Sequence, residues 1–273
     1  MIETIHIFDE FSQAPDELTT EQRHQKRMTL DPLIYDILKA KYGKKLQEFW
    51  ENHNMPKKPD SYLILVERRI HPNLAFVLQN AAYFARGWGI VLICSDLNYE
   101  YCKMLCQGKD IDIRPFFQGN PDSSVGKTEY NSLLKSGSFY SSLPGEHHLF
   151  LQVDTYLRKP VPEEWKQFDY IAAPYEWDES SVGGGLSYRK KSSMIALCSK
   201  KPNTVCDEDA YICEGIKELG MKMPPFENAV TYISESCIYE DPIGVHQWWT
   251  FFFPNQTEGA EEIFHSLLSL EID

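Results

Sequence analysis

The sequence has no long apolar run and no excess of positive charge, and these two absences remove whole classes of protein. Apolar segments such as 62–66 have the length of a strand and fall far short of the roughly 20 residues that a membrane-spanning helix needs. We therefore expect no membrane span. Among the 273 residues, 40 are acidic and 27 are basic, for a net charge of -13. This balance disfavours binding to nucleic acid or to an anionic membrane through net charge.

Cysteine pairing and an export signal are also missing. The seven cysteines contain no Cys-x-x-Cys pair, and Cys102 and Cys106 have no second pair that would complete a tetrahedral zinc site. Reduced thiols in a reducing compartment are therefore expected. Residues 1–4 lack the basic start and apolar core of a signal peptide, so we expect a cytoplasmic protein.

Two phosphate-binding motifs are absent as well. Gly126-Lys127-Thr128 has the end of a P-loop, but that motif needs a glycine five residues before Gly126, where Pro121 stands. No Gly-x-Gly-x-x-Gly follows the first predicted strand. These absences disfavour an ATP-binding P-loop and a nicotinamide enzyme of the Rossmann type.

What the sequence does contain is a regular alternation of strand and helix patterns that begins near residue 61 and predicts an α/β fold. The predicted strands cover 62–67, 90–94, 111–117, 149–153 and 169–174, and the predicted helices cover 71–86, 98–107, 129–134, 190–198 and 206–219. Such units favour a Rossmann-like, mostly parallel central sheet flanked by helices, with right-handed crossovers.

Both ends of the chain are predicted to be helical. Residues 1–60 form an N-terminal helical extension with an amphipathic helix over 30–52, for which we expect a packing or partner role, including a possible homodimer. The tail from 258 predicts a closing amphipathic helix. The basic residues of the extension are typical of a solvated face. They are Arg23, Lys26 and Arg27.

Asp154 is the first candidate for a functional residue. It directly follows the apolar strand pattern over 149–153. In open α/β sheets, ligands bind in the crevice beyond the carboxyl ends of the strands. Asp154 is therefore placed either to contact a ligand or to cap the turn into Thr155.

Four further features carry alternatives. The three glycines Gly183-Gly184-Gly185 favour a ligand-facing loop over a flexible surface loop, while the alternation that follows them suggests an ordered strand. The carboxylates at 207–209 either suit a helix dipole or handle a proton or a cation. His246 is either a core residue or a functional one. Asn131 either donates to a diphosphate or caps a turn.

A series of short motifs follows a defined order between Ser61 and Trp249. The motifs are Val66-Glu67-Arg68-Arg69, His71-Pro72-Asn73, Glu129-Tyr130-Asn131, Phe150-Leu151-Gln152-Val153-Asp154-Thr155, Asp169-Tyr170-Ile171-Ala172-Ala173-Pro174, Gly184-Gly185-Leu186-Ser187-Tyr188-Arg189, Glu208-Asp209 and His246. Together they resemble a sparsely characterised family of glycosyltransferase-like proteins with the GT-A fold.

The resemblance implies a GT-A-like glycosyltransferase domain over 61–257, with the helix over 258–273 packed on it. It implies a nucleotide-sugar donor, with a UDP-sugar expected first, and a glycan acceptor. In GT-A enzymes an Asp-x-Asp motif at a strand end holds a divalent metal against the donor diphosphate. Gln152 stands at the first position here, so only Asp154 matches, and His246 is placed in sequence to complete the metal site. The expected ion is Mn²⁺ or Mg²⁺, because oxygen ligands suit hard cations.

The reaction itself requires further groups. A sugar hydroxyl that attacks an anomeric carbon needs a base, and the departing diphosphate needs positive charge. Asp209, with Glu208 as the alternative, is the predicted base of an inverting displacement. Arg69 has the alternative of pairing with a carboxylate. The predicted nucleotide-binding residues are Val66, Glu67, Arg69, Asp96, Asn131 and Gln152, and the predicted donor or acceptor pocket contains Gly184, Gly185 and Trp248.

Two other functions stay open at this stage. A nucleotidyltransferase would have a similar nucleotide-binding half, but it would need a basic loop after the first strand to bind a triphosphate. Arg68-Arg69 supplies only two basic residues at that place. A non-catalytic carbohydrate-binding protein on a decayed transferase fold is suggested by Gln152 and by aromatic residues such as Trp177. Hydrolysis of a UDP-sugar by the pure protein would distinguish these alternatives.

Overall fold

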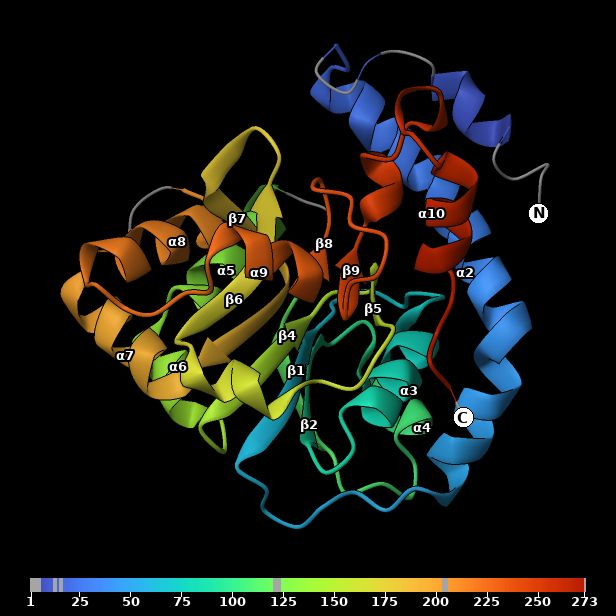
Figure 1. Ribbon diagram of the computed structural model, residues 1–273. Helices are drawn as coiled ribbons and strands as arrows, with labels where there is room; N and C mark the ends of the chain where they lie inside the picture. Colours follow the sequence, from blue (N-terminus) through green and yellow to red (C-terminus); the bar gives the residue numbers. More distant parts are fainter. Residues whose placement is uncertain (1–5, 12–13, 15–16, 120–123, 203–205, 273) are drawn as a thin grey trace.

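The computed structural model describes residues 6–11, 14, 17–119, 124–202 and 206–272, and these residues form an α/β fold (Figure 1). The strands are β1 (Ser61–Val66), β2 (Gly89–Ser95), β3 (Asp112–Phe117), β4 (His147–Leu151), β5 (Thr155–Leu157), β6 (Tyr170–Tyr175), β7 (Asp178–Lys190), β8 (Ile233–Ser234) and β9 (Gly244–His246). The α-helices are α2 (Thr20–Asn52), α3 (Leu74–Phe84), α4 (Tyr99–Leu105), α5 (Ser124–Leu134), α6 (Gly137–Ser142), α7 (Lys191–Lys200), α8 (Glu208–Glu218), α9 (Phe226–Tyr232) and α10 (Ala260–Leu267). Short 3₁₀ helices are η1 (Phe8–Phe11), η2 (Glu163–Gln167), η3 (Trp248–Thr250) and η4 (Pro254–Gln256).

Within the described residues, the central sheet has six strands in the order β3-β2-β1-β4-β7-β6. The first four of these are parallel, and β7 is antiparallel to both β4 and β6. The predicted mostly parallel α/β sheet is confirmed. From β1 the chain moves outward to β2 and β3, then returns to place β4 on the other side of β1. The strand order thus reverses between β1 and β4, which is where open α/β sheets bind ligands.

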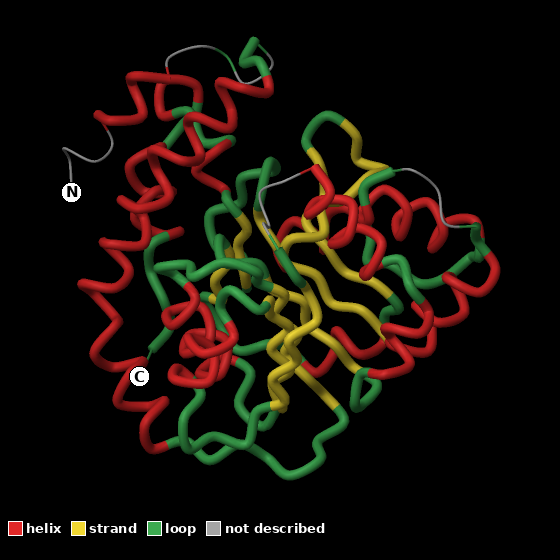
Figure 2. The backbone as a smooth tube through the Cα atoms, turned by 180° about the vertical axis from the view of Figure 1, so that it is seen from behind, coloured by secondary structure: helices red, strands yellow, loops and turns green. Residues whose placement is uncertain are grey.

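Helices cover both faces of the sheet (Figures 1 and 2). Alternate residues of β1 enter two different cores, as a strand buried on both faces requires. Leu63 and Leu65 belong to the core shared with α2 and α3, whereas Ile64 and Val66 belong to the core shared with α5 to α8. The sheet therefore holds the carboxyl ends of its parallel strands on a rigid platform.

The long helix of the N-terminal extension begins earlier than the sequence suggested. Helix α2 starts at Thr20 rather than near residue 30, because Thr19 and Gln22 form a reciprocal capping box. It packs along α3, and both views show the C-terminus beside it, where the amide of Leu270 donates to the Tyr42 hydroxyl at 3.1 Å (Figures 1 and 2). No helix in the described ranges has both the length and the apolarity to cross a membrane.

The prediction of a solvated basic face is wrong for Lys26, whereas Arg23 and Arg27 are partly exposed. Lys26 is fully buried, its ammonium group donates to the carbonyl of Phe252 at 2.7 Å, and it lies 3.3 Å from the ring centroid of Phe253. The aromatic rings around it supply cation–π attraction in place of water. Burial lowers the pKa of Lys26 to about 7. Arg27, the next residue, reaches the site described below.

The stability of the wild type should therefore depend on pH through Lys26, and the Lys26→Met variant should lose this dependence. In the unfolded chain Lys26 holds its proton up to its ordinary pKa of 10.5, whereas the folded protein releases it near pH 7. Unfolding in this interval takes up a proton, so raising the pH stabilises the wild type relative to the variant, by at most about 1.4 kcal/mol per pH unit. Urea unfolding of both proteins at the two ends of this interval measures the difference. Parallel pH profiles would contradict the prediction.

Candidate functional site

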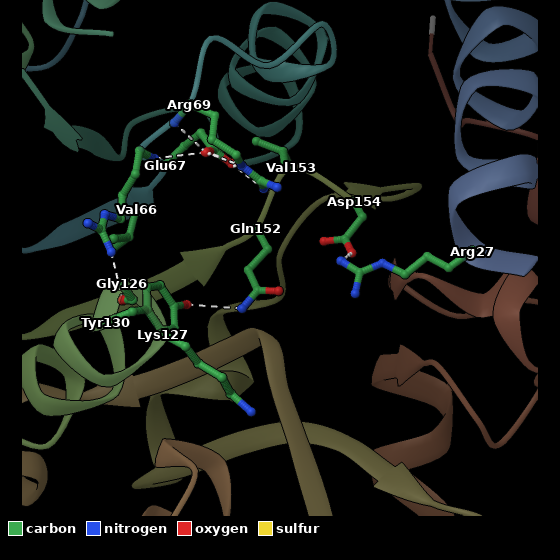
Figure 3. A pocket seen from close by; sticks show the side chains of 11 residues that line it. Arg27, Val66, Glu67, Arg69, Gly126, Lys127, Tyr130, Gln152, Val153 and Asp154 are labelled. Carbon is green, nitrogen blue, oxygen red and sulfur yellow. Dashed lines mark hydrogen bonds and ion pairs between the residues drawn. The ribbon is translucent and has the colours of Figure 1, made fainter. Parts of the chain in front are cut away.

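A cavity of about 230 Å³ lies at the carboxyl ends of β1 and β4 (Figure 3). We call it the switch-point cavity. Its walls come from the segments that follow these two strands, from the first turns of α5, and from α2. It is lined by Arg27, Val66, Glu67, Arg68, Arg69, Gly126, Lys127, Tyr130, Gln152, Val153 and Asp154. The position agrees with the reversal of strand order, and the lining contains more basic than acidic side chains.

The loop after β1 is fixed by Glu67. Its carboxylate accepts the backbone amides of Arg68 at 2.8 Å and Arg69 at 2.7 Å, and it also binds the Arg69 guanidinium through Nε at 3.0 Å and Nη2 at 3.1 Å. Arg69 thus makes the carboxylate pair that the sequence left as an alternative. Both residues line the cavity, but the charge of Glu67 is already satisfied within its own loop.

Arg68 connects this loop to the start of α5. The side chain is buried, and its Nη1 donates to the carbonyl of Gly126 at 2.6 Å while Nη2 donates to Glu129 at 3.1 Å. Its Nε is also buried and has no hydrogen-bond partner among the described residues. An unpaired buried donor beside a cavity costs free energy unless a ligand or water accepts from it. The start of α5 adds the positive end of a helix dipole to the same wall.

Asp154 lies at the edge of the cavity that faces α2. It is 3% exposed, and Oδ2 forms an ion pair with the guanidinium of Arg27 (Figure 3). Its Oδ1 lies 3.5 Å from Nε2 of His246. Burial alone would raise the pKa of Asp154, but Arg27 and His246 outweigh burial and hold the pKa well below its usual range. The carboxylate is therefore a permanent negative charge with two cationic neighbours.

His246 reaches Asp154 because the small sheet β5-β9-β8 pairs Thr155 with His246. Its Nδ1 lies 3.1 Å from Oε2 of Glu235, a residue that the sequence did not indicate. Burial by itself lowers the pKa of His246, but Glu235 and Asp154 together raise the pKa to about 10. At neutral pH the side chain is thus an imidazolium between two carboxylates. Glu235 stands alone between two serines, so no spacing pattern marked it.

These residues do not fit a three-ligand metal centre as they are arranged. Asp154 and Glu235 approach opposite nitrogens of one imidazole, and the second oxygen of Asp154 is held by Arg27. Among the described residues, no group of three or more histidine, cysteine or acidic side chains converges on one point. Arg27 holds Oδ2 of Asp154, whereas Oδ1 of Asp154 and both imidazole nitrogens of His246 make no hydrogen bond with the described residues. The expected Mn²⁺ or Mg²⁺ stays a prediction, and no chemical step below depends on it.

The three glycines are part of strand β7 rather than a loop, which corrects the sequence-based expectation. Pairing with β6 jumps from Ser187 to Gly183, so the intervening residues form an enlarged bulge. A Cβ atom at Gly183 would lie 2.4 Å from Oε2 of Glu235, and one at Gly185 would lie 2.2 Å from Nε2 of His246. The close approach that the glycines predicted is therefore real, but it is made by side chains of this chain.

The middle glycine, Gly184, faces the start of α8. A Cβ there would lie 2.9 Å from Oε1 of Glu208 and 3.3 Å from the Cβ of Asp209. Glu208 is buried and lies 3.4 Å from Nη2 of the fully buried Arg189. Asp209 is partly exposed and accepts from the hydroxyl of Tyr175 at 3.0 Å. The two neighbouring carboxylates thus have different partners.

The remaining predicted site residues separate into two groups. Val66 and Gln152 line the cavity, where Nε2 of Gln152 donates to the Tyr130 hydroxyl at 3.0 Å (Figure 3). Three others do not reach it. Asp96 has an exposed side chain away from the lining, Asn131 accepts from the amide of Glu208 at 2.7 Å, and Trp248 is fully buried with its indole N–H donated to Tyr156 at 2.8 Å.

These partners predict that Glu208→Gln and Asp209→Asn differ in stability although each removes one charge. In Glu208→Gln the buried guanidinium of Arg189 loses its counter-charge, which costs about 3–5 kcal/mol. In Asp209→Asn a partly exposed carboxylate is replaced, and the cost should stay within about 1 kcal/mol. Urea unfolding of both variants measures the difference. Equal stability of Glu208→Gln and the wild type would contradict the structural role of Glu208.

Comparison with known proteins gives one family and a distant structural neighbour. A family model described as "Protein of unknown function (DUF5672)" matches residues 117–246, less than half of the chain. This range contains Asp154, Glu208, Asp209, Glu235 and His246 but neither α2 nor β1. No curated protein matches the sequence. Among solved structures, the apo-form glycosyltransferase GlyE of Streptococcus pneumoniae TIGR4 is similar with a TM-score of 0.49 and 10% sequence identity, over 78% of this chain and 61% of that chain. The chain thus spans less than two thirds of the length of GlyE.

Proposed function

We propose that this protein is a GT-A-type glycosyltransferase that binds a nucleoside diphosphate sugar in the switch-point cavity and transfers the sugar to an acceptor hydroxyl. One observation carries the proposal. A cavity rich in basic side chains lies at the reversal of strand order, and carboxylates lie along the three glycines of β7, which approach Asp154 of the cavity through His246. The first part suits a diphosphate, and the second suits the proton transfer of the reaction.

The charges of the cavity support binding of a diphosphate. Glu67 is neutralised within its own loop, and Asp154 has both Arg27 and His246 as cationic neighbours. The buried Nε of Arg68 adds a hydrogen-bond donor to the same wall. A diphosphate that enters finds charge-assisted donors that are already in place, so little reorganisation opposes its binding. We take the nucleoside to be uridine, as the resemblance implies.

Positive charge near the diphosphate also serves the chemical step. When the bond between the anomeric carbon and the diphosphate oxygen breaks, negative charge develops on the leaving group. Arg27 and the imidazolium of His246 flank Asp154 at the edge of the cavity. In our proposal Asp154 holds these two cations in position, and they stabilise the leaving group whether or not a divalent ion joins them.

Asp209 is the proposed general base. It is partly exposed, and its contacts are the Tyr175 hydroxyl at 3.0 Å and the amide of Ala210 at 2.8 Å. Neither contact is an ion pair, so Asp209 can accept the proton of the attacking hydroxyl without breaking one. Glu208, the alternative base, is committed to Arg189. Attack from the side opposite the leaving diphosphate gives an inverting displacement.

The first test is binding of UDP by calorimetry, with Mn²⁺ and separately with a chelator. We expect binding by the wild type and a loss of about tenfold or more in Arg27→Met, because one charge-assisted contact is worth about 1.5–3 kcal/mol and Asp154 is left uncompensated. Arg114→Met, which removes a partly exposed arginine of β3 outside the cavity, is the matched control. Equal UDP affinity with Mn²⁺ and with chelator would show that UDP binding does not require the metal ion.

Activity is measured with the same protein and a panel of UDP-sugars, by release of UDP with and without acceptor glycans. Hydrolysis of one donor supports the transferase. Release of pyrophosphate from a nucleoside triphosphate and a sugar phosphate would instead support a nucleotidyltransferase. Absence of UDP binding would refute the proposed function at its first step.

The second test concerns the base. Asp209→Asn should lower the turnover of transfer by about 10²–10⁴-fold, the usual contribution of a general base, while UDP affinity stays at the wild-type value. Glu214→Gln, on the outer face of the same helix, is the control and should transfer normally. Full transfer activity in Asp209→Asn would show that Asp209 is not the general base.

A further inference from the structure

An exposed tryptophan stands at the tip of the hairpin that connects β6 to β7. Tyr175 pairs with Asp178, so Glu176 and Trp177 form a two-residue turn. All six tryptophans lie within the described residues, and Trp177 is 59% exposed while the other five are at most 7% exposed. A large aromatic ring left in water at a hairpin tip is a typical feature of a binding surface.

The ring of Trp177 is held in place rather than loosely attached. It stacks on Tyr175 with a centroid distance of 4.7 Å and an interplanar angle of 15°, and it packs at 5.7 Å against Phe251, which follows the segment that carries His246. The turn is anchored by the amide of Glu176, which donates to the buried Ser236 hydroxyl at 3.1 Å. Three aromatic residues from two separate segments thus form a fixed platform.

This platform adjoins the proposed base. Tyr175, on which Trp177 stacks, donates its hydroxyl to Asp209 at 3.0 Å. The same Tyr175 ring lies 3.1 Å from the Cβ position of Gly183, next to Glu235. One ring therefore separates the exposed tryptophan from Asp209. Trp177 does not line the switch-point cavity, so this platform is separate from the proposed donor site.

The chemistry of this surface indicates its ligand. A pyranose ring has an apolar C–H face that packs on an indole ring, while its hydroxyl edge donates to carboxylates. The carboxylate next to the platform is Asp209, whose hydrogen-bond partners are a hydroxyl and an amide, so an acidic or phosphorylated sugar would meet repulsion. A neutral sugar satisfies both conditions.

We propose that Trp177, supported by Tyr175 and Phe251, is the acceptor subsite and binds the ring of a neutral carbohydrate next to Asp209. The role of this sugar as an acceptor rests on the proposed function, whereas the binding of a carbohydrate to Trp177 does not. Stacking of the acceptor on a fixed ring would orient its hydroxyl toward the base, and such positioning is a large part of the catalysis of a bimolecular reaction.

The test uses the tryptophan itself as the probe. Because the other five tryptophans are buried, acrylamide quenches mainly the emission of Trp177. Quenching is measured with cellobiose, lactose, xylobiose and N,N′-diacetylchitobiose at millimolar concentrations, and with sialyllactose as the acidic counterpart. At least one neutral sugar should protect the emission and sialyllactose should protect it less. Trp177→Ala should lose both the quenchable emission and the protection. No protection by any of the four neutral sugars would overturn the proposal.

A kinetic arm separates this proposal from the previous one. With the donor and acceptor found active, Trp177→Ala should raise the KM for the acceptor severalfold to about tenfold with a smaller change in kcat, and Trp177→Phe should recover most of the loss. UDP binding by calorimetry reports whether the cavity keeps its shape. If a neutral sugar protects Trp177 but UDP does not bind, the transferase fails and the carbohydrate site stands. If UDP binds and no sugar protects, the platform alone fails.

Discussion

The ion-pair cluster around Asp154 is the constraint on which the rest of the site depends. Asp154 leaves the end of β4 and meets Arg27 from α2 and His246 from β9, and His246 continues to Glu235. Asp154, His246 and Glu235 are each at most 5% exposed, and an isolated charge at such burial costs several kcal/mol. The cluster therefore couples the N-terminal helix, the central sheet and the small sheet into one unit.

Strand β7 supplies the space that this cluster needs. At Gly183, Gly184 and Gly185 a side chain would collide with Glu235, Glu208 or His246, so the absence of side chains allows charged groups from three segments to lie against one strand. The enlarged bulge in the pairing with β6 curves the strand at the same place. This packing requirement explains why three glycines stand inside a strand, where they are otherwise unfavourable.

The sequence was sufficient for features that are local or periodic. Strand and helix patterns predicted the parallel sheet, and the rule for strand ends in α/β sheets directed attention to Asp154, which lines the switch-point cavity. Arg27 and Glu235 were beyond such reasoning. The first contacts Asp154 across 127 positions, and the second depends on the pairing of the two-residue strand β8 with β9. Trp248 was misplaced because burial by distant aromatic residues has no sequence pattern.

The two carboxylates of the proposed mechanism differ in their partners, and this difference suits different roles. Asp154 is enclosed by Arg27 and His246, so protonating it would leave two cations without a counter-charge, and it is fixed as an anion. Asp209 has a neutral hydroxyl and an amide as partners, so taking a proton breaks no ion pair. Environment separates the roles of paired carboxylates in the same way in acid–base enzymes. In the proposed mechanism, Asp154 thus supplies a permanent charge near Gly185, through His246, and Asp209 supplies a proton acceptor near Gly184, beside the aromatic platform.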